Sequence, residues 1–398
     1  MKFSIVIPYK QRLHNIKIVL ASLAAQTMDA SQFEIVVGAM EYSPEYAAAC
    51  REFTDRLNIV SVLTAEEWNV SRARNLAIRH AAGDVIVFLD ADMALPPRML
   101  QTIHERYFAA GQRHCVVGQM VGYSGALTNK DVQSIDELSY DHYRTVLAEL
   151  EETGDVGTDM RWKVHPVPQP WTLVWTALVA VPTATVRQHD LYFDTAFRGW
   201  GAEDQEWGYR VHTAGTPIVL AADVYGLHLP HHRNGSANRH TLVTNKDYFL
   251  TKWPCLDVEL FRAFEFDGAN ERYFEVKAEL ARLVPETGGA LATVRGTIDG
   301  TDTLLIGAPF DTRRQTCPPQ ITGRFDTDAP LEILPLTGFA LPYPDQSVHD
   351  CQILAPINGL SAFLRDTVHN EARRVARNLV PVDALVKAVR AAAGRRVA

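Results

Sequence analysis

The first 120 residues alternate short apolar runs with longer segments in which apolar residues recur at helical spacing. Short apolar runs predict strands buried on both faces, and the longer segments predict helices that cover them. The predicted strands are Phe3–Pro8, Phe33–Val37, Ile59–Leu63, Asp84–Asp90 and Cys115–Met120. Residues with the spacing of one helix face between the first two strands are Ile16, Val19, Leu20 and Leu23. This pattern predicts an α/β fold built on a mostly parallel sheet.

A second helix is predicted just before the strand at 84–90. Ser71 is its expected N-cap, the helix runs through Ala82, and Gly83 ends it. The strand then leads directly into Asp90-Ala91-Asp92. Ligands of open α/β sheets bind beyond the carboxyl ends of the strands, so these two aspartates lie where a site is expected.

From residue 121 onward the pattern is less regular. An acidic helical stretch, Asp131–Glu152, leads through Gly154–Gly157 to the proline-rich Val164–Pro170, which together predict an insertion over the site. The later predicted elements are a β segment at Trp171–Pro182, a helix that contains Trp207, Arg210, Val211 and Ala214 and ends at Gly215, and a strand at Pro217–Ala222.

The chain changes character after Trp253-Pro254. A long amphipathic stretch reaches Val284, and Pro285–Gly289 then marks a boundary. The tail contains a strand-like run, Thr303–Ile306, and a helix with one apolar face formed by Leu364, Val368, Ala372, Val375 and Leu379. We therefore expect a large α/β domain at 1–255, a helical connector at 256–289 and a smaller α/β domain at 290–398.

Composition and charge narrow the classes of partner. The 398 residues are 47% hydrophobic and 22% charged, which is typical of globular proteins. A net charge of -8 argues against nucleic acid or an anionic membrane as a partner. No apolar run approaches the roughly 18 residues needed to cross a bilayer, and five scattered cysteines argue against a disulfide scaffold. The sequence predicts a protein without a transmembrane segment, located in the cytoplasm.

Asp90 and Asp92 are candidate metal ligands, because both carboxylates can converge on one cation where a strand breaks into a turn. Mg2+ and Mn2+ favour oxygen ligands, commonly carboxylates together with substrate phosphates. The ion would act as a Lewis acid that neutralises charge on a departing diphosphate. A D-x-D triplet also occurs in ordinary surface turns, so these two residues alone do not identify a site.

Two further polar pairs follow later in the chain. His228 and His231 lie three residues apart just past a predicted strand, so one or both imidazoles can approach the same ion; the alternative is a solvated polar loop. Glu203 and Asp204 open the helix that contains Trp207. The helix dipole favours carboxylates there, so one interpretation is capping. The other is that one carboxylate removes a proton from an acceptor hydroxyl.

These motifs, together with Val70–Ala77 and Ser4–Tyr9, resemble the family 2 glycosyltransferases. The similarity consists of an I-V-I-P strand, a helix with A-R-N, and A-x-G-D-x-I-x-F-L-D-A-D, in that order. The later G-W-G-x-E-D-x-E and H-x-x-H-x-R blocks resemble the C-terminal signature of β-1,4-galactosyltransferases, N-acetylgalactosaminyltransferases and chondroitin-type synthases. The resemblance covers residues 1–255 and implies an α/β fold of the GT-A type.

The resemblance implies nucleotide-binding roles for residues near the strand ends. Pro8 and Tyr9 would lie by the nucleotide base, Arg74 by the base or the diphosphate, and Asp90 by the ribose. Family members commonly have an acidic pair after the second strand that reads uracil. This chain has Glu41 there instead, which would bind the nucleotide in place of the pair, so UDP and other nucleotides both stay open as the donor's nucleotide.

The resemblance also implies a metal site and a base. Asp92 and His231 would hold Mn2+ or Mg2+, and His228 would assist them. Asp204 would be the catalytic base, and Glu203 would bind the acceptor or donor sugar. The tryptophans that could stack against sugar faces are Trp200 and Trp207, although large aromatics at helical spacing are more often core residues.

The tail has a second, fainter likeness. Leu341–Asp350 and Glu371–Val375 resemble the later half of a class I methyltransferase, but Leu305–Pro309 supplies only one glycine of the loop that would hold S-adenosylmethionine. We therefore expect a non-catalytic Rossmann-like remnant that serves in homo-oligomerisation or acceptor capture.

The leading hypothesis is a metal-dependent inverting glycosyltransferase. It would move a hexose or N-acetylhexosamine from a nucleotide-diphosphate donor, a UDP-sugar, to the hydroxyl of a glycan, peptide, lipid or small natural product. Inversion is implied because a base such as Asp204 lets the acceptor oxygen attack from the face opposite the diphosphate. The alternative is a non-catalytic sugar-nucleotide or glycan binding protein on the same fold. A third hypothesis, a methyltransferase with an unusual N-terminal domain, fails because the glycine-rich loop is absent.

Overall fold

The structure is a computed structural model that describes residues 1–122, 138–153, 159–231, 235–284 and 289–381. The chain forms two compact units, an N-terminal unit (Met1–Asn245) and a C-terminal unit (Lys246–Ala398), whereas the sequence placed the first boundary at 255. The two units are described separately. None of the helices in the described ranges is both long enough and apolar enough to cross a membrane.

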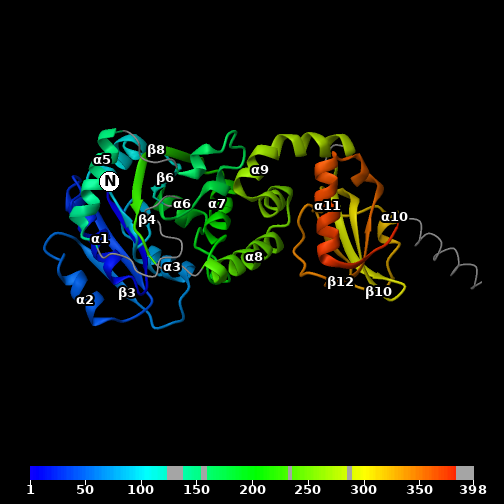
Figure 1. The fold of residues 1–398 in the computed structure, drawn as a ribbon, viewed down its shortest axis with the longest axis horizontal. Coiled ribbons are helices and arrows are strands. Elements are labelled where there is room, and N and C mark those ends of the chain that lie inside the picture. The colour runs from blue at the N-terminus through cyan, green and yellow to red at the C-terminus, as the bar shows by residue number, and fades with distance from the viewer. Residues whose placement is uncertain (123–137, 154–158, 232–234, 285–288, 382–398) are drawn as a thin grey trace, which may run out of the picture. The chain divides into compact units, whose positions relative to one another are not determined.

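The N-terminal unit is built on an eight-stranded sheet with the order β3-β2-β1-β4-β7-β6-β8-β5 (Figure 1). Its strands are β1 (Phe3–Tyr9), β2 (Phe33–Ala39), β3 (Ile59–Leu63), β4 (Val85–Leu89), β5 (Met93–Ala94), β6 (Cys115–Val121), β7 (Leu178–Pro182) and β8 (Ile218–His228). Strands β1, β2, β3 and β4 are parallel, as are β6 and β8, and β7 and β5 are antiparallel to their neighbours. The predicted α/β architecture with a mostly parallel sheet, of the GT-A type, is confirmed.

Helices cover both faces of this sheet. The helices of this unit are α1 (Leu13–Ala24), α2 (Pro44–Arg51), α3 (Val70–His80), α4 (Met99–Ile103), α5 (Tyr140–Thr153), α6 (Thr183–Gln188), α7 (Glu203–Thr213) and the first part of α8 (Gly235–Lys252). Side chains alternate across a strand, so Ile5 of β1 packs in one apolar core with α1, and Val6 packs in a second core with α3 and α7. Burial on both faces explains why the strands read as continuous apolar runs.

Strand pairing brings distant segments to the carboxyl end of β4. Strand β7 runs antiparallel to β4 with Leu178 opposite Leu89, so the residues before β7 lie beside those after β4. Strand β5 pairs with the end of β8, and Met93 lies opposite His228. The loop after β4 therefore meets segments that follow it in sequence by more than 80 residues.

Several predicted elements differ from the structure. The N-cap of α3 is Asn69, whose side chain accepts a hydrogen bond from the Arg72 amide, so the Ser71 prediction is wrong. Asn69 has the extended backbone that a cap needs, whereas Ser71 is already inside the helix. The predicted β segment at 171–182 is a strand only over Leu178–Pro182, because Pro170–Leu173 forms a 3-10 turn. The predictions for 131–137 and for Gly154–Gly157 lie outside the described residues.

The C-terminal unit contains a five-stranded mixed sheet with the order β11-β9-β10-β12-β13. Its elements are α9 (Leu256–Leu283), β9 (Gly289–Ile298), β10 (Thr301–Asp311), α10 (Pro319–Thr322), β11 (Glu332–Leu334), β12 (Val348–Ile353), α11 (Ala362–Val375) and β13 (Ala376–Leu379). The predicted α/β character of the tail is confirmed, and its likeness to a methyltransferase stays a prediction. Leu379 lies in β13 beyond the helix, so its place on the predicted helical face is wrong.

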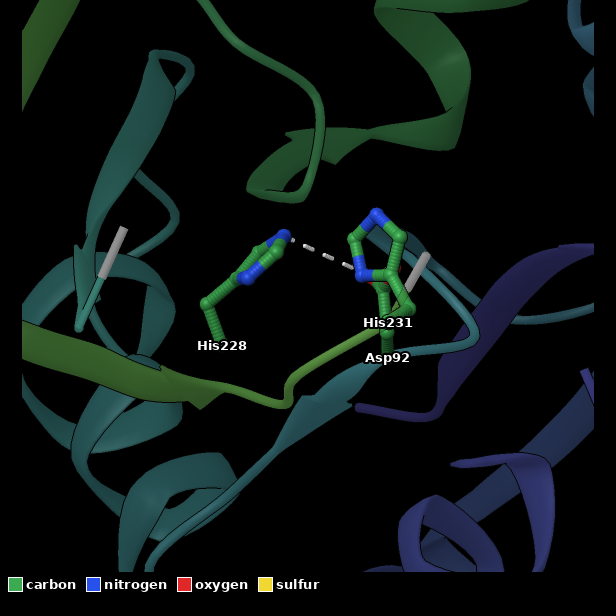
Figure 2. Close-up of side chains that lie close together, drawn as sticks. All are labelled: Asp92, His228 and His231. Carbon is green, nitrogen blue, oxygen red and sulfur yellow. Dashed lines mark ion pairs between the residues drawn. The ribbon is translucent and has the colours of Figure 1, made fainter. Parts of the chain in front are cut away.

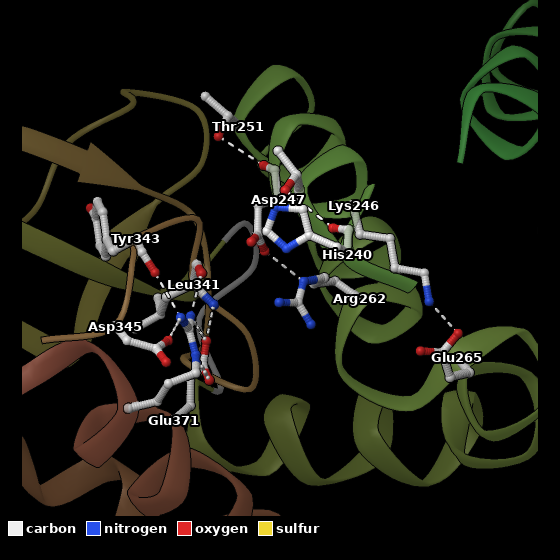
Figure 3. Close-up of polar contacts among 12 residues, drawn as sticks. His240, Lys246, Asp247, Thr251, Arg262, Glu265, Leu341, Tyr343, Asp345 and Glu371 are labelled. Atoms are coloured by element: carbon white, nitrogen blue, oxygen red, sulfur yellow. Dashed lines mark hydrogen bonds and ion pairs between the residues drawn. The ribbon is translucent and has the colours of Figure 1, made fainter. Parts of the chain in front are cut away.

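Polar contacts tie α9 to the rest of the C-terminal unit. The fully buried Glu259 carboxylate accepts hydrogen bonds from the amides of Thr337, Gly338 and Phe339 at 2.7–2.9 Å. Figure 3 shows the ion pairs of the same region, including Arg262 with Asp247 at 2.6 Å. The boundary predicted at Pro285–Gly289 falls mainly on 285–288, which lie outside the described residues.

Candidate functional site

Asp92, His228 and His231 converge at the edge where β5 pairs with β8 (Figure 2). The distance from Asp92 Oδ2 to His231 Nδ1 is 3.1 Å, and that from Asp92 Oδ1 to His228 Nε2 is 4.0 Å. The pairing is fixed by the backbone, because the Leu229 amide donates to the Asp92 carbonyl oxygen at 2.7 Å. The structure thus brings together the three residues that the family resemblance implied as metal ligands, whereas Asp90, the other candidate, pairs with Arg74.

This cluster is mostly buried. Each of the three residues offers one ligand atom, and these atoms all lie within 4.8 Å of one another. The Arg12 guanidinium, at the loop that follows β1, also pairs with Asp92 Oδ2. A buried carboxylate with two imidazoles is a donor set that can accept a divalent cation. Arg233 of the H-x-x-H-x-R block lies outside the described residues.

A second cluster surrounds Arg74, which projects from α3 and is almost fully buried. Its Nη1 donates to Asp204 Oδ1 at 2.9 Å and to Glu203 Oε1 at 3.4 Å, and its Nη2 donates to Asp90 Oδ1 at 3.2 Å. The guanidinium also lies over the Phe193 ring, 5.1 Å from the ring centroid. One arginine therefore joins the first aspartate of the D-x-D turn to both carboxylates at the start of α7.

Burial and the neighbouring charges shift the pKa values of Glu203, Asp90 and Arg74. Burial raises the pKa of Glu203 to about 7, and the neighbouring Asp204 charge adds to this effect against the attraction of Arg74. Burial also raises the pKa of Asp90, with Arg74 opposing the shift and Asp92 and Asp204 reinforcing it. Burial alone would lower the pKa of Arg74, but the three carboxylates raise it above its ordinary value. The arginine is a permanent cation, and it is the main counter-charge for the acids.

The turn before α7 explains how Glu203 and Asp204 reach this place. Gly199 and Gly201 have φ values of 70° and 98°, and Ala202 has a φ of 68°, all in the left-handed region that favours glycine. The prediction that these carboxylates open a helix is confirmed. The glycines of the G-W-G block are needed for the shape of this turn, which aims the first two helical residues at Arg74.

The predicted nucleotide-binding residues lie at the ends of β1 and β2. Pro8 and Tyr9 are buried, and the Tyr9 ring stacks on Tyr46 with 4.2 Å between ring centroids. Burial and the nearby Glu41 charge raise the pKa of Tyr9 to about 12. The Glu41 carboxylate accepts a hydrogen bond from the Gln11 amide at 2.7 Å. In this structure Tyr9 is thus a packed residue, and Glu41 holds the loop after β1.

The two candidate tryptophans have different surroundings. Trp207 is fully buried, stacks on Phe193 and donates through Nε1 to the Leu191 carbonyl, so of the two alternatives it is a core residue and does not contact a sugar. Trp200 is 44% exposed, and its amide is held by the Thr241 hydroxyl at 3.1 Å. Of these two tryptophans, only Trp200 presents an aromatic surface to solvent.

Sequence reasoning missed two polar residues of the site, Arg12 and Thr176. The Thr176 hydroxyl donates to Asp204 Oδ1. Arg12 could have been found, because it follows a predicted strand at the same edge of the sheet as the D-x-D turn. Thr176 carries no such signal, since it precedes an antiparallel strand whose place in the sheet cannot be read from local sequence.

Residues 4–162 match the family model described as Glycosyl transferase family 2. The predicted resemblance to the family 2 glycosyltransferases is confirmed over these residues. This match agrees with the motif resemblance and covers β1, α3 and the D-x-D turn. The prediction that the protein is a glycosyltransferase is confirmed by this match and by its curated relatives.

Two relatives of this glycosyltransferase cover nearly the whole chain. It is 26% identical over 411 residues to validoxylamine A glucosyltransferase of Streptomyces hygroscopicus subsp. jinggangensis (strain 5008), a match that covers 95% of this chain and 96% of that protein. It is 27% identical over 414 residues to the protein of the same description from subsp. limoneus, with 95% and 89% covered. Among solved structures, S. aureus TarS 1-349 matches with a TM-score of 0.47 and 14% identity over 72% of this chain and 76% of that one.

Proposed function

We propose that the protein transfers a glucosyl group, with inversion and with a divalent metal, from a UDP-sugar to an acceptor hydroxyl. The observation that carries the proposal is the pair of adjoining clusters at the end of β4. Asp92 meets two imidazoles, and Asp90 is linked through Arg74 to Asp204. The metal, the donor and the inverting mechanism are proposals. Glycosyl transfer as the activity is supported by the family match and by the relatives.

The Asp92 cluster has the chemistry of a metal site. One carboxylate oxygen and two imidazole nitrogens suit Mn2+ better than Mg2+, which prefers oxygen ligands alone. A bound ion would supply Lewis-acid stabilisation of the charge on the departing diphosphate. Three protein ligands from one side would leave the remaining positions to the diphosphate oxygens, which supports a site for a nucleotide-diphosphate donor.

Asp204 is the proposed general base. Its side chain is 20% exposed, so it can reach an acceptor, whereas that of Glu203 is only 8% exposed and has a raised pKa. The base would take the proton of the acceptor hydroxyl while the acceptor oxygen attacks the anomeric carbon opposite the diphosphate. Glu203 would then bind the acceptor or donor sugar through a hydrogen bond, and Trp200 would lie against a sugar face.

The nucleotide would lie along the carboxyl ends of β1 and β2. We place the base by Pro8 and Tyr9, with Glu41 nearby, and the ribose by Asp90, on the family resemblance. Two relatives that cover 95% of the chain are named as glucosyltransferases, which supports glucose as the donor sugar. Their named acceptor, validoxylamine A, is the first acceptor to test.

The donor and the metal can be tested together by thermal shift. UDP-glucose with Mn2+ is expected to raise the melting temperature, because a ligand of the folded state stabilises it by mass action. Chelation with EDTA, or Asp92→Ala, should remove the metal-dependent part of the shift, whereas Asp55→Ala, at an exposed carboxylate, should retain it. An undiminished shift with the Asp92 variant would exclude the metal site.

The base can be tested by kinetics. Asp204→Asn should lower kcat by about 10²–10⁴-fold, the usual contribution of a general base, while donor binding stays close to that of the parent. Asp55→Asn is the control. Product analysis by NMR should show the anomeric configuration opposite to that of the donor. Retention of configuration would contradict the assigned role of Asp204.

A further inference from the structure

We propose that Thr176 and Arg74 are positioning residues for Asp204, and that they hold one carboxylate oxygen so that the other faces the acceptor. The inference rests on the proposed function, in which Asp204 is the base. It assigns a role to Thr176, which belongs to none of the motifs, and it gives Arg74 a task beyond the donor side of the site.

Both hydrogen bonds to the Asp204 side chain end on the same oxygen. Arg74 Nη1 donates to Oδ1 at 2.9 Å, and the Thr176 hydroxyl donates to the same atom. Among the residues that the structure describes, none donates a hydrogen bond to Oδ2. The carboxylate is therefore asymmetric, with one oxygen fixed and the other available.

The two donors are themselves held firmly. Thr176 is fully buried two residues before β7, and the carbonyl of the adjacent Ala177 accepts a hydrogen bond from the Asp90 amide at 3.1 Å. Arg74 is 2% exposed and is fixed by three carboxylates and the Phe193 ring. Asp204 in contrast reaches partly into solvent. A base at the surface is thus oriented by two donors from the interior.

This asymmetry suits proton abstraction. With Oδ1 occupied by two donors, the acceptor proton passes to Oδ2 as the acceptor oxygen bonds to the anomeric carbon. The bond from that carbon to the diphosphate oxygen breaks, and its electron pair leaves with the diphosphate. A base held in one rotamer meets the acceptor hydroxyl in the reactive geometry more often, and this raises the rate of proton transfer. Arg74 also binds Asp90, so the same guanidinium fixes the base relative to the donor side.

The test separates the Thr176 hydroxyl from its methyl group. Thr176→Val keeps the shape and removes the hydroxyl, and we expect kcat to fall about tenfold with donor binding unchanged, as for a misplaced catalytic group. Thr176→Ser keeps the hydroxyl and should retain kcat within about twofold of the parent. The matched control is Thr183→Val, which removes a buried hydroxyl that donates to the Gly83 carbonyl at 2.7 Å. It should leave kcat unchanged, and melting temperatures show whether each variant is folded.

The outcomes distinguish this inference from the proposed function. A Thr176→Val enzyme with the kcat of the parent overturns the positioning role, and so does a Thr176→Ser enzyme as slow as Thr176→Val, since packing of the methyl group would then be the cause. Asp204→Asn is measured alongside. If it retains full transfer, the assignment of the base fails and the positioning role fails with it. If it is inactive, a failure at Thr176 concerns this inference alone.

Discussion

Replacing Arg74 by Met should destabilise the N-terminal unit strongly. The substitution keeps an unbranched side chain of good helix propensity in α3 and removes the guanidinium. Asp90, Glu203 and Asp204 then lose the cation to which all three are hydrogen-bonded. The loss comes from acids left close together without a counter-charge, because Met replaces most of the buried volume of the side chain.

The magnitude follows from the burial of these acids. Removing one partner of a buried ion pair costs about 3–5 kcal/mol. Here the Asp90 and Asp204 side chains are 29% and 20% exposed and keep some contact with water, and Glu203 can become neutral because its pKa is raised to about 7. We therefore expect the lower end, about 3 kcal/mol, which corresponds to roughly 6–12 °C in Tm for a domain of this size.

Urea unfolding followed by far-ultraviolet circular dichroism measures this loss at pH 8. Arg79→Met is the matched control, because Arg79 lies on the same helix, is exposed and only covers the Tyr192 ring at 5.6 Å. The control should change the free energy of unfolding by less than about 1 kcal/mol. At pH 5 the loss in the Arg74 variant should shrink, because Glu203, whose pKa is raised to about 7, becomes protonated and neutral. An Arg74 variant as stable as the control at pH 8 would refute the electrostatic account of this cluster.

Two further predictions concern stability. The pKa of Glu203 rises from its usual 4.5 to about 7 on folding, so the native state keeps the proton to a higher pH than the unfolded state does. The free energy of unfolding should therefore fall by up to about 3 kcal/mol as pH rises from 4.5 to 7. Glu203→Gln should flatten this dependence in urea unfolding across that range, and an unchanged slope would contradict the assignment. Asn69→Ala should cost about 2 kcal/mol, because the side chain caps α3 at Arg72 and also donates to the Phe197 carbonyl at 2.8 Å. Ser71→Ala should stay within about 0.5 kcal/mol of the parent in the same urea unfolding, and the reverse order would restore Ser71 as the cap.

The strands and most helices could be predicted because their signals are local. Each buried strand has a short apolar run of its own, and the repeat of apolar positions marks α1 and α11 whatever they pack against. The cap of α3 was assigned wrongly because Asn69 and Ser71 are both good capping residues by type. Only the extended backbone of Asn69, with φ -152° and ψ 117°, decides between them. The role of Trp207 could not be decided from the sequence for the same reason, since an aromatic side chain suits a core and a sugar face equally well.

The α/β class and the chemical groups of the site can be predicted from residue type and order, because the acidic turn, the acidic helix start and the paired histidines are recognisable without any contact being known. Tertiary structure alone decided which of these groups meet. Asp90 and Asp92 are two residues apart, yet one joins Arg74 and the other joins the imidazoles. Thr176 reaches Asp204 across 28 residues of sequence. Such contacts follow from how the strands pair, and pairing depends on packing of the whole sheet rather than on any local segment.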